Sequence, residues 1–255
     1  MPTKQITRVR RKYYMRLAAM LRPKNKYRKG QDPEFRWRGQ DVTRVENLSD
    51  IVFALSFGLL VTASTAPKTY DDLLSLLASF PSVAFAMAIL FMIWNFHFVY
   101  FRRYGLVDKP IIFLNAALLF LVIFFAYPLK FMADVMLAAI VMIFGNAEPI
   151  TGFRIGFEQI GELLALYSLV YAAIFLVIYL MYRHALKQSD QLELTASEQN
   201  LTKKAMASCQ VQVAFGVIIA GLANFTPLGP WAGFVFMLIG PVSWLVDKWA
   251  HKKTS

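Results

Sequence analysis

Residues 44–66 read RVENLSDIVFALSFGLLVTASTA, and this stretch decides the class of fold. It opens with charged and polar side chains and becomes apolar from Ile51 onward. As a helix, the segment from Asn47 to Ala66 has the roughly 20 residues needed to cross a hydrocarbon layer of about 30 Å. The sequence therefore predicts a membrane-spanning helix here, with its one charge, Asp50, near the start.

Five further apolar stretches are long enough to cross a bilayer. They cover about residues 74–101, 110–144, 157–182, 205–223 and 228–246. The stretch over 110–144 contains Pro128, so we expect a kink there and a helix end that projects beyond the bilayer. The chain is 57% hydrophobic and only 17% charged, whereas soluble domains have about 25% charged residues. The sequence thus predicts an all-α polytopic membrane protein with six transmembrane helices.

The net charge of +11 allows two interpretations. A strongly basic chain is often a nucleic-acid binder, but the cytoplasmic loops of membrane proteins also collect Lys and Arg. With the N-terminus inside and six spans, all of the 27 Lys and Arg except Lys68, Lys130 and Arg154 fall on one side. The charge therefore indicates topology, and we expect both termini in the cytoplasm and no nucleic-acid partner.

Three regions follow from this topology. We expect a basic cytoplasmic arm at residues 1–43, a six-helix membrane domain at residues 44–250 and a cytoplasmic tail at residues 251–255. The arm has no acidic residue before Asp32, and its Lys and Arg are interspersed with Tyr, Met and Leu. Such a segment lies on anionic lipid as an interfacial helix or stays a solvated arm. A mitochondrial transit peptide would usually be rich in Ser, which the arm lacks.

Polar side chains at membrane depth are costly and therefore indicate candidate functional sites. Arg44, Ser49 and Asp50 lie at the start of the first span, and Trp94 and His97 share a face near the end of the second. Consecutive spans run antiparallel, so both groups lie at similar depth and could form one hydrogen-bonded network. The simpler interpretations are that Asp50 stabilises the helix start, that Trp94 belongs to the interfacial aromatic belt and that His97 packs in the core.

Other chemistry has little support in the sequence. Cys209 is the only cysteine, and no spacing of Cys and His fits a zinc site. His184 and His251 follow predicted helix ends, where we expect them to be solvated. No Gly-rich phosphate-binding loop is found. We therefore expect no enzymatic activity, no bound metal and no cofactor.

The polar start of the first span also matches a known family. Its pattern Arg-x-x-x-Leu-Ser-Asp, from Arg44 to Asp50, resembles the Arg-x-x-x-Phe-Ser-Asp signature of the transmembrane protein 175 family, the lysosomal potassium channels and their prokaryotic relatives. The resemblance covers most of residues 44–250 and includes Trp94-x-x-His97, Asn115 and Tyr127-Pro128. It implies a single-repeat prokaryotic member: a homotetrameric potassium channel of the cell membrane, with permeant potassium ions and a bilayer as its surroundings.

In that family the first helix lines the pore, and bulky apolar side chains form its constriction. The matching positions here are Leu55, Leu59 and Thr62, whose spacing places them on one stripe of a helix. Most apolar stripes pack against the chain's own helices, and spacing alone does not favour a pore. Leu48 replaces the signature Phe, and Gly58 stands where many prokaryotic relatives have a Thr that favours potassium. The resemblance therefore implies a leucine constriction with only weak preference for potassium over sodium.

Two other classes remain as alternatives. A proton-coupled secondary transporter or antiporter usually carries several ionisable groups near the membrane midplane and shows inverted repeats. The deep ionisable residues of this chain are few, namely Lys130, Asp134 and Glu162, and no internal repeat is visible. A non-conducting membrane scaffold is the third class, and flux measurements separate all three.

Overall fold

The computed structural model of the chain describes residues 35–62, 67–144, 157–226 and 229–238. In these ranges the regular elements are α2 (Arg44–Thr62), α3 (Tyr70–Ala78), α4 (Phe80–Tyr104), α5 (Lys109–Phe144), α6 (Phe157–Lys187), α7 (Ala196–Phe225) and the 3₁₀ helix η1 (Gly229–Leu238). Five of them, α2, α4, α5, α6 and α7, are long and apolar enough to cross a membrane. The predicted all-helical membrane fold is confirmed for the described residues.

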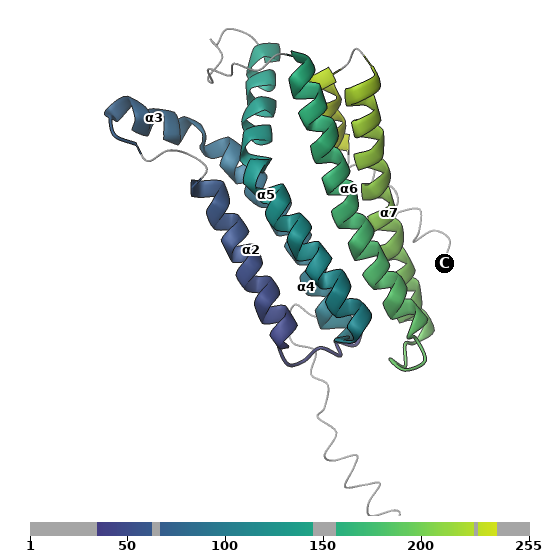
Figure 1. Cartoon of the computed structure of the whole chain (residues 1–255). Helices are drawn as coiled ribbons and strands as arrows, with labels where there is room; N and C mark the ends of the chain where they lie inside the picture. Colours follow the sequence, from purple (N-terminus) through teal and green to yellow (C-terminus); the bar gives the residue numbers. More distant parts are fainter. Residues whose placement is uncertain (1–34, 63–66, 145–156, 227–228, 239–255) are drawn as a thin grey trace, which may run out of the picture. The chain divides into compact units, whose positions relative to one another are not determined.

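Successive spans alternate in direction, and α6 and α7 form the most extensive pair (Figure 1). Gly216 of α7 faces α6 so closely that a Cβ there would lie 2.6 Å from the carbonyl oxygen of Ser168. Small residues allow membrane helices to approach each other and gain packing contacts. α2 lies at the opposite edge, against α4 and α5. Its own chain therefore covers α2 on one side, where Ser49, Phe53, Ser56 and Leu60 are buried.

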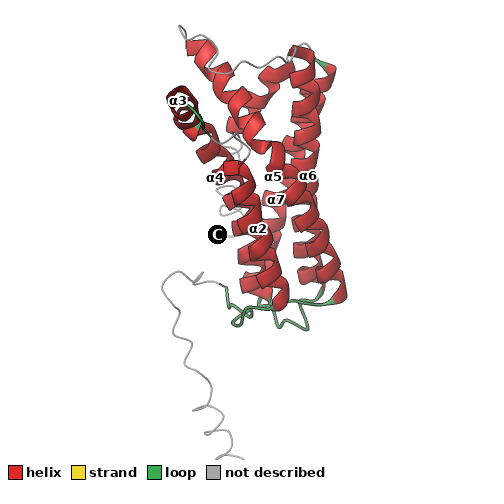
Figure 2. Cartoon of the chain, turned by 60° about the vertical axis from the view of Figure 1, so that its left-hand side comes forward, coloured by secondary structure: helices red, strands yellow, loops and turns green. Residues whose placement is uncertain are grey.

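The starts of α2, α5 and α7 and the ends of α4 and α6 lie together, and we call this the basic end because it carries Arg38, Arg102 and Lys187. Local signals place these helix ends. Thr43 and Glu46 form a capping box at α2, in which the Glu46 amide donates to Thr43 Oγ1 (3.3 Å) and the Thr43 amide to Glu46 Oε1 (3.0 Å). Figure 2, with loops in green, shows the connecting loops gathered at this end.

The prediction of one span over residues 74–101 is wrong at its start. Residues 70–78 form the separate helix α3, and α4 begins only at Phe80. The physical reason is Pro81 in the first turn of α4, which has no N–H to continue the α3 hydrogen-bond ladder. α3 has no buried residue and projects away from the spans in Figure 1.

The third predicted span is confirmed, since α5 continues through Pro128 to Phe144 and is bent in Figure 1. Lys130 Nζ contacts Asp134 Oδ2 at 2.8 Å one helical turn later. The predicted sixth span begins with η1, and its remainder lies outside the described residues, as do residues 1–34 of the arm and the tail over 251–255. The count of six spans and the three-region division therefore stay predictions.

Candidate ion pathway

The polar cluster that the sequence indicates between the first two spans contains a direct contact between α2 and α4. Trp94 Nε1 of α4 donates a hydrogen bond to Asp50 Oδ1 of α2 at 3.0 Å. The indole ring is half-buried and stacks on Phe98, with ring centroids 5.2 Å apart. Asp50 is exposed and lies in the second turn of α2, while Thr43 and Glu46 supply the cap. Asp50 thus presents a carboxylate at the surface of α2 while Trp94 orients it.

A second, buried part of the cluster joins α2, α4 and α5 through Asn115. The Asn115 amide Nδ2 donates to Ser49 Oγ at 3.0 Å, and its carbonyl oxygen lies 2.9 Å from His97 Nε2. Because a carbonyl oxygen only accepts, His97 must carry its proton on Nε2. Ser49 Oγ in turn donates to the Val45 carbonyl at 2.8 Å. The side chains of Ser49, His97 and Asn115 are buried. Their hydrogen bonds therefore satisfy polar groups that water does not reach.

The structure does not bring Arg44 into this cluster. Its side chain is exposed, and no contact to Ser49, Asp50, Trp94 or His97 is observed. The basic partner at this end of α2 is instead Arg102 of α4, whose Nη2 forms an ion pair with Glu46 Oε2. Both of these side chains are buried. A buried, hydrogen-bonded ion pair fixes the position of α2 relative to α4. Removal of either side chain would leave the other charge buried without a partner.

Several of these residues were not in the candidate set from the sequence. Asn115 appeared only within the family resemblance, although an amide in an apolar span is itself a signal. Glu46 was detectable from the Thr-x-x-Glu spacing of a capping box. His184, expected to be solvated after a helix end, instead lies in the last turn of α6, where its Nε2 is 2.6 Å from Asp108 Oδ2.

The candidate pore residues lie on the face of α2 that points away from its own chain. Leu55 is 56% exposed, Thr62 is exposed and Leu59 is half-buried. The opposite face carries buried side chains such as Phe53 and Leu60, which pack in the core. Within the described residues, the stripe of Leu55, Leu59 and Thr62 is thus not used to pack α2 on α4 and α5. Ala66, the next residue on the stripe, lies outside the described residues.

Gly58 lies on the same outer side of α2. A Cβ at this position would meet no atom within 4 Å, so the chain itself leaves room for a side chain. Thr62 Oγ1 donates to the Gly58 carbonyl at 3.0 Å, which uses its proton and leaves lone pairs on the hydroxyl oxygen. Thr62 is therefore the residue of the candidate stripe that carries a hydroxyl.

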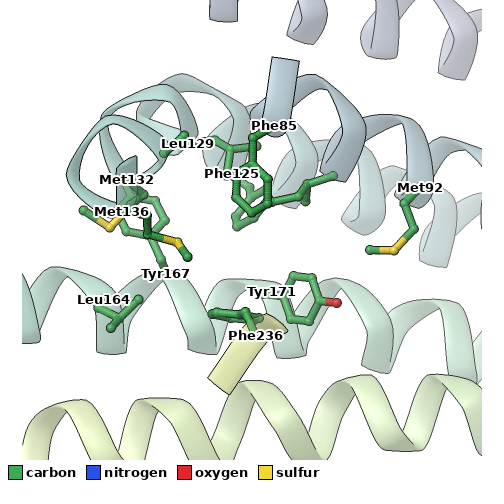
Figure 3. Close-up of a pocket in the computed structure, with 12 residues that line it drawn as sticks. Phe85, Met92, Phe125, Leu129, Met132, Met136, Leu164, Tyr167, Tyr171 and Phe236 are labelled. Atoms are coloured by element: carbon green, nitrogen blue, oxygen red, sulfur yellow. The ribbon is translucent and has the colours of Figure 1, made fainter. Parts of the chain in front are cut away.

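A separate cavity of about 270 Å³ lies between α4, α5, α6 and η1 (Figure 3). Figure 3 shows Phe85 and Phe125 on one side and Tyr171 and Phe236 on the other. None of its lining residues is charged, and none comes from α2. An apolar space of this kind supplies no ligands that could replace the hydration shell of a cation, and it shares no residue with the candidate stripe of Leu55, Leu59 and Thr62.

The part of the chain that the structure describes contains no candidate metal site. In these ranges, no group of three or more His, Cys, Asp or Glu side chains is placed to hold a metal ion. Cys209 is buried in α7. The polar contacts of the cluster instead join one helix to another. Contacts of this kind fix the position of a helix.

Comparisons with known proteins identify the family of the chain. Residues 44–125 match the sequence model of the family described as endosomal/lysosomal potassium channel TMEM175. A protein of Marivirga tractuosa named "Potassium channel" is 34% identical over 232 residues, which cover 88% of this chain and 94% of the relative. A crystal structure of a variant of the potassium channel MtTMEM175, in complex with a Nanobody-MBP fusion protein, matches with a TM-score of 0.75 at 32% identity. It covers 88% of this chain and 99% of that one. The chain therefore belongs to the TMEM175 family.

Proposed function

We propose that this chain is a potassium-permeable cation channel of the cell membrane. In this proposal four copies assemble as a homotetramer, each with six spans and with both termini in the cytoplasm. Similarity to a protein named a potassium channel and to a crystal structure of a potassium channel, at 34% and 32% identity and each over 88% of this chain, supports the potassium permeability. Contact of the basic arm with anionic lipid is part of the proposal as well.

The observation that carries the proposal is the uncovered face of α2. Leu48, Ile51 and Leu55 are 55%, 66% and 56% exposed on this face, while the opposite face is buried against the chain's other helices. A span with one packed face and one free apolar face suits a position beside a symmetry axis, where copies of the same helix cover it. Four copies of α2 would then place Leu55, Leu59 and Thr62 around a common pore.

The side chains on this stripe suit a hydrophobic gate. Narrow rings of Leu55 and Leu59 would exclude water and stop ions, so conduction requires the rings to widen. The contacts of Ser49, Asp50, Trp94 and His97 hold the basic end of α2 and would set its tilt. Four copies of Asp50 near the entrance would attract cations. Gly58 supplies no hydroxyl, which supports weak preference for potassium over sodium.

Reconstitution of the protein in planar bilayers tests the proposal. We expect wild-type channels to carry potassium current with a small shift of the reversal potential under potassium/sodium bi-ionic conditions. Leu55→Ala shortens a side chain of the proposed constriction and should enlarge the current or lower selectivity. Leu166→Ala is the matched control, because Leu166 is 50% exposed on α6 and not on α2.

Two results would contradict the proposal. If Leu55→Ala and Leu166→Ala conduct alike, α2 does not form the constriction. If a proton gradient drives potassium uphill in a vesicle flux assay, the protein is a proton-coupled transporter and not a channel. Equal currents with and without the gradient support passive conduction.

A further inference from the structure

The segment that leads into α2 is anchored at Arg38 to a distant part of the chain. The guanidinium group has five N–H donors, and each one has an acceptor. Nε donates to the Leu192 carbonyl (2.7 Å), Nη1 to the Arg36 carbonyl (2.9 Å) and Glu198 Oε1 (3.0 Å), and Nη2 to the Glu193 carbonyl (3.1 Å) and Glu198 Oε2 (2.9 Å). The Arg38 and Glu198 side chains are 12% and 3% exposed.

The loop between α6 and α7 is shaped to receive this arginine. Glu193 adopts a left-handed backbone conformation with φ of 49°, which is uncommon for a residue other than Gly. Its carbonyl is one of the Arg38 acceptors. Glu198 also accepts from the backbone amides of Thr195 and Arg36, both at 2.9 Å, so its carboxylate links the cap of α7 to the incoming segment. Such bidentate, charge-assisted contacts combine strength with fixed geometry.

Gly39, the residue that follows Arg38, is held against the end of α4 as well. Gly39 donates to the Arg102 carbonyl at 3.2 Å, and a Cβ on Gly39 would lie 2.2 Å from the Phe101 carbonyl oxygen. The backbone therefore lies directly on the end of α4. On the other side of Arg38, the buried Phe35 ring packs edge-on against Tyr104, with centroids 5.4 Å apart. Only five residues therefore separate Arg38 from the start of α2, and the first of them, Gly39, lies on the end of α4.

From this arrangement we propose that Arg38 and Glu198 are positioning residues of the channel. Their contact ties the basic end of the pore helix α2 to the α6–α7 hairpin and holds the constriction closed. The inference rests on the proposed function, in which conduction requires α2 to move away from the pore axis. α2 itself packs on α4 and α5, so the Arg38 contact, together with the bond from the Arg36 amide to Glu198, is a direct link through which the α6–α7 hairpin restrains that movement. Breaking it should favour the conducting state.

Single-channel recordings of Arg38→Gln and Glu198→Gln test the proposal. We expect the open probability of each variant to rise by about fivefold or more, the lower end of ordinary coupling between two sites. Unitary conductance and reversal potential should stay unchanged, because the constriction residues are the same. Arg36→Gln is the matched control, since it removes the same charge two residues earlier from an exposed side chain. The effect of the double variant should be smaller than the sum of the two single effects, because both changes break the same Arg38–Glu198 ion pair.

A second measurement does not depend on conduction. Hydrogen exchange of the α2 amides near the basic end should accelerate in Arg38→Gln and stay at the wild-type rate in Arg36→Gln. Unchanged or lower open probability in Arg38→Gln would overturn the proposal, and so would unchanged exchange in α2. If the wild type carries no current while the exchange result holds, the channel function fails and the anchoring of α2 stands.

Discussion

Replacing Asn115 by Leu should destabilise the fold because Asn115 joins three helices. Leu has a similar size, so the main loss is polar. His97 Nε2 loses its acceptor at 2.9 Å, and Ser49 loses the amide donor at 3.0 Å but keeps its bond to the Val45 carbonyl. An unsatisfied buried donor costs about 1–3 kcal/mol, and a hydrogen bond between membrane helices is worth about 0.6 kcal/mol. The expected loss is about 1.5–3.5 kcal/mol in the free energy of unfolding.

The assay is reversible unfolding of the purified protein in detergent, followed by tryptophan fluorescence. Asn95→Leu is the control, because it is the same substitution on α4 at an exposed position. A surface change of that kind should stay within about 0.5 kcal/mol of wild type. Potassium flux should change in Asn115→Leu and not in Asn95→Leu, since only Asn115 contacts the proposed pore helix.

The variant His97→Phe separates the effect of the lost hydrogen bond from the effect of changed packing. His97 lies between the rings of Phe53 and Phe101, with centroids 5.6 and 4.7 Å away, so Phe fits its surroundings. In His97→Phe the donor that Asn115 satisfies is gone, and Asn115→Leu should then cost about 1 kcal/mol less than in wild type. Additive effects of the two changes, or equal effects of Asn115→Leu and Asn95→Leu, would show that the Asn115 hydrogen bonds do not stabilise the fold.

Three further predictions concern packing, selectivity and pH. Gly216→Ala should lower the free energy of unfolding, because the added Cβ would clash with α6. Gly221→Ala, where a Cβ meets no atom within 4 Å, should raise it by about 0.5–1 kcal/mol. Unfolding titrations of both variants compare the two effects, and equal shifts would contradict the close approach of α7 to α6 at Gly216. Gly58→Thr should increase the preference for potassium over sodium in bi-ionic recordings, and an unchanged reversal potential would argue against a filter at this level. Hydrogen bonds from the Lys68 amide and from Thr69 lower the pKa of Asp72 from its usual 3.8. The resulting stabilisation of α3 is therefore complete above that usual value and is lost as the pH falls through the lowered pKa. Amide protection measured against pH should show this loss in wild type and in Asp71→Asn, but not in Asp72→Asn.

Much of the helix pattern could be predicted because its signals are local. The apolar run after Asp50 predicts a span, and the spacing of Thr195 and Glu198 is that of a capping box, which starts α7. The break at Ser79 was missed because the apolar residues before and after Pro81 read as one continuous stretch. Hydropathy indicates which segments are apolar enough to lie in the membrane, but it does not show where a helix is interrupted.

The candidate cluster was predicted in outline and completed only by the structure. Antiparallel consecutive spans place Asp50 and Trp94 at similar depth, and the bond from Trp94 to Asp50 follows that expectation. Asn115 as the link between Ser49 and His97 depends on how α5 packs against both helices. Arg44 was expected in the cluster from its sequence neighbourhood, but its side chain lies outside it.

By itself the sequence determined the membrane class, most of the spans, the concentration of basic residues at one end and the family resemblance. These depend on length, apolarity and short motifs, which act within one segment of chain. Only the tertiary structure decided which face of α2 is covered and that Arg38 meets Glu198, 160 residues away. The reason is physical: side-chain hydrogen bonds and burial need partners from other helices, and only folding brings those partners within a few ångströms.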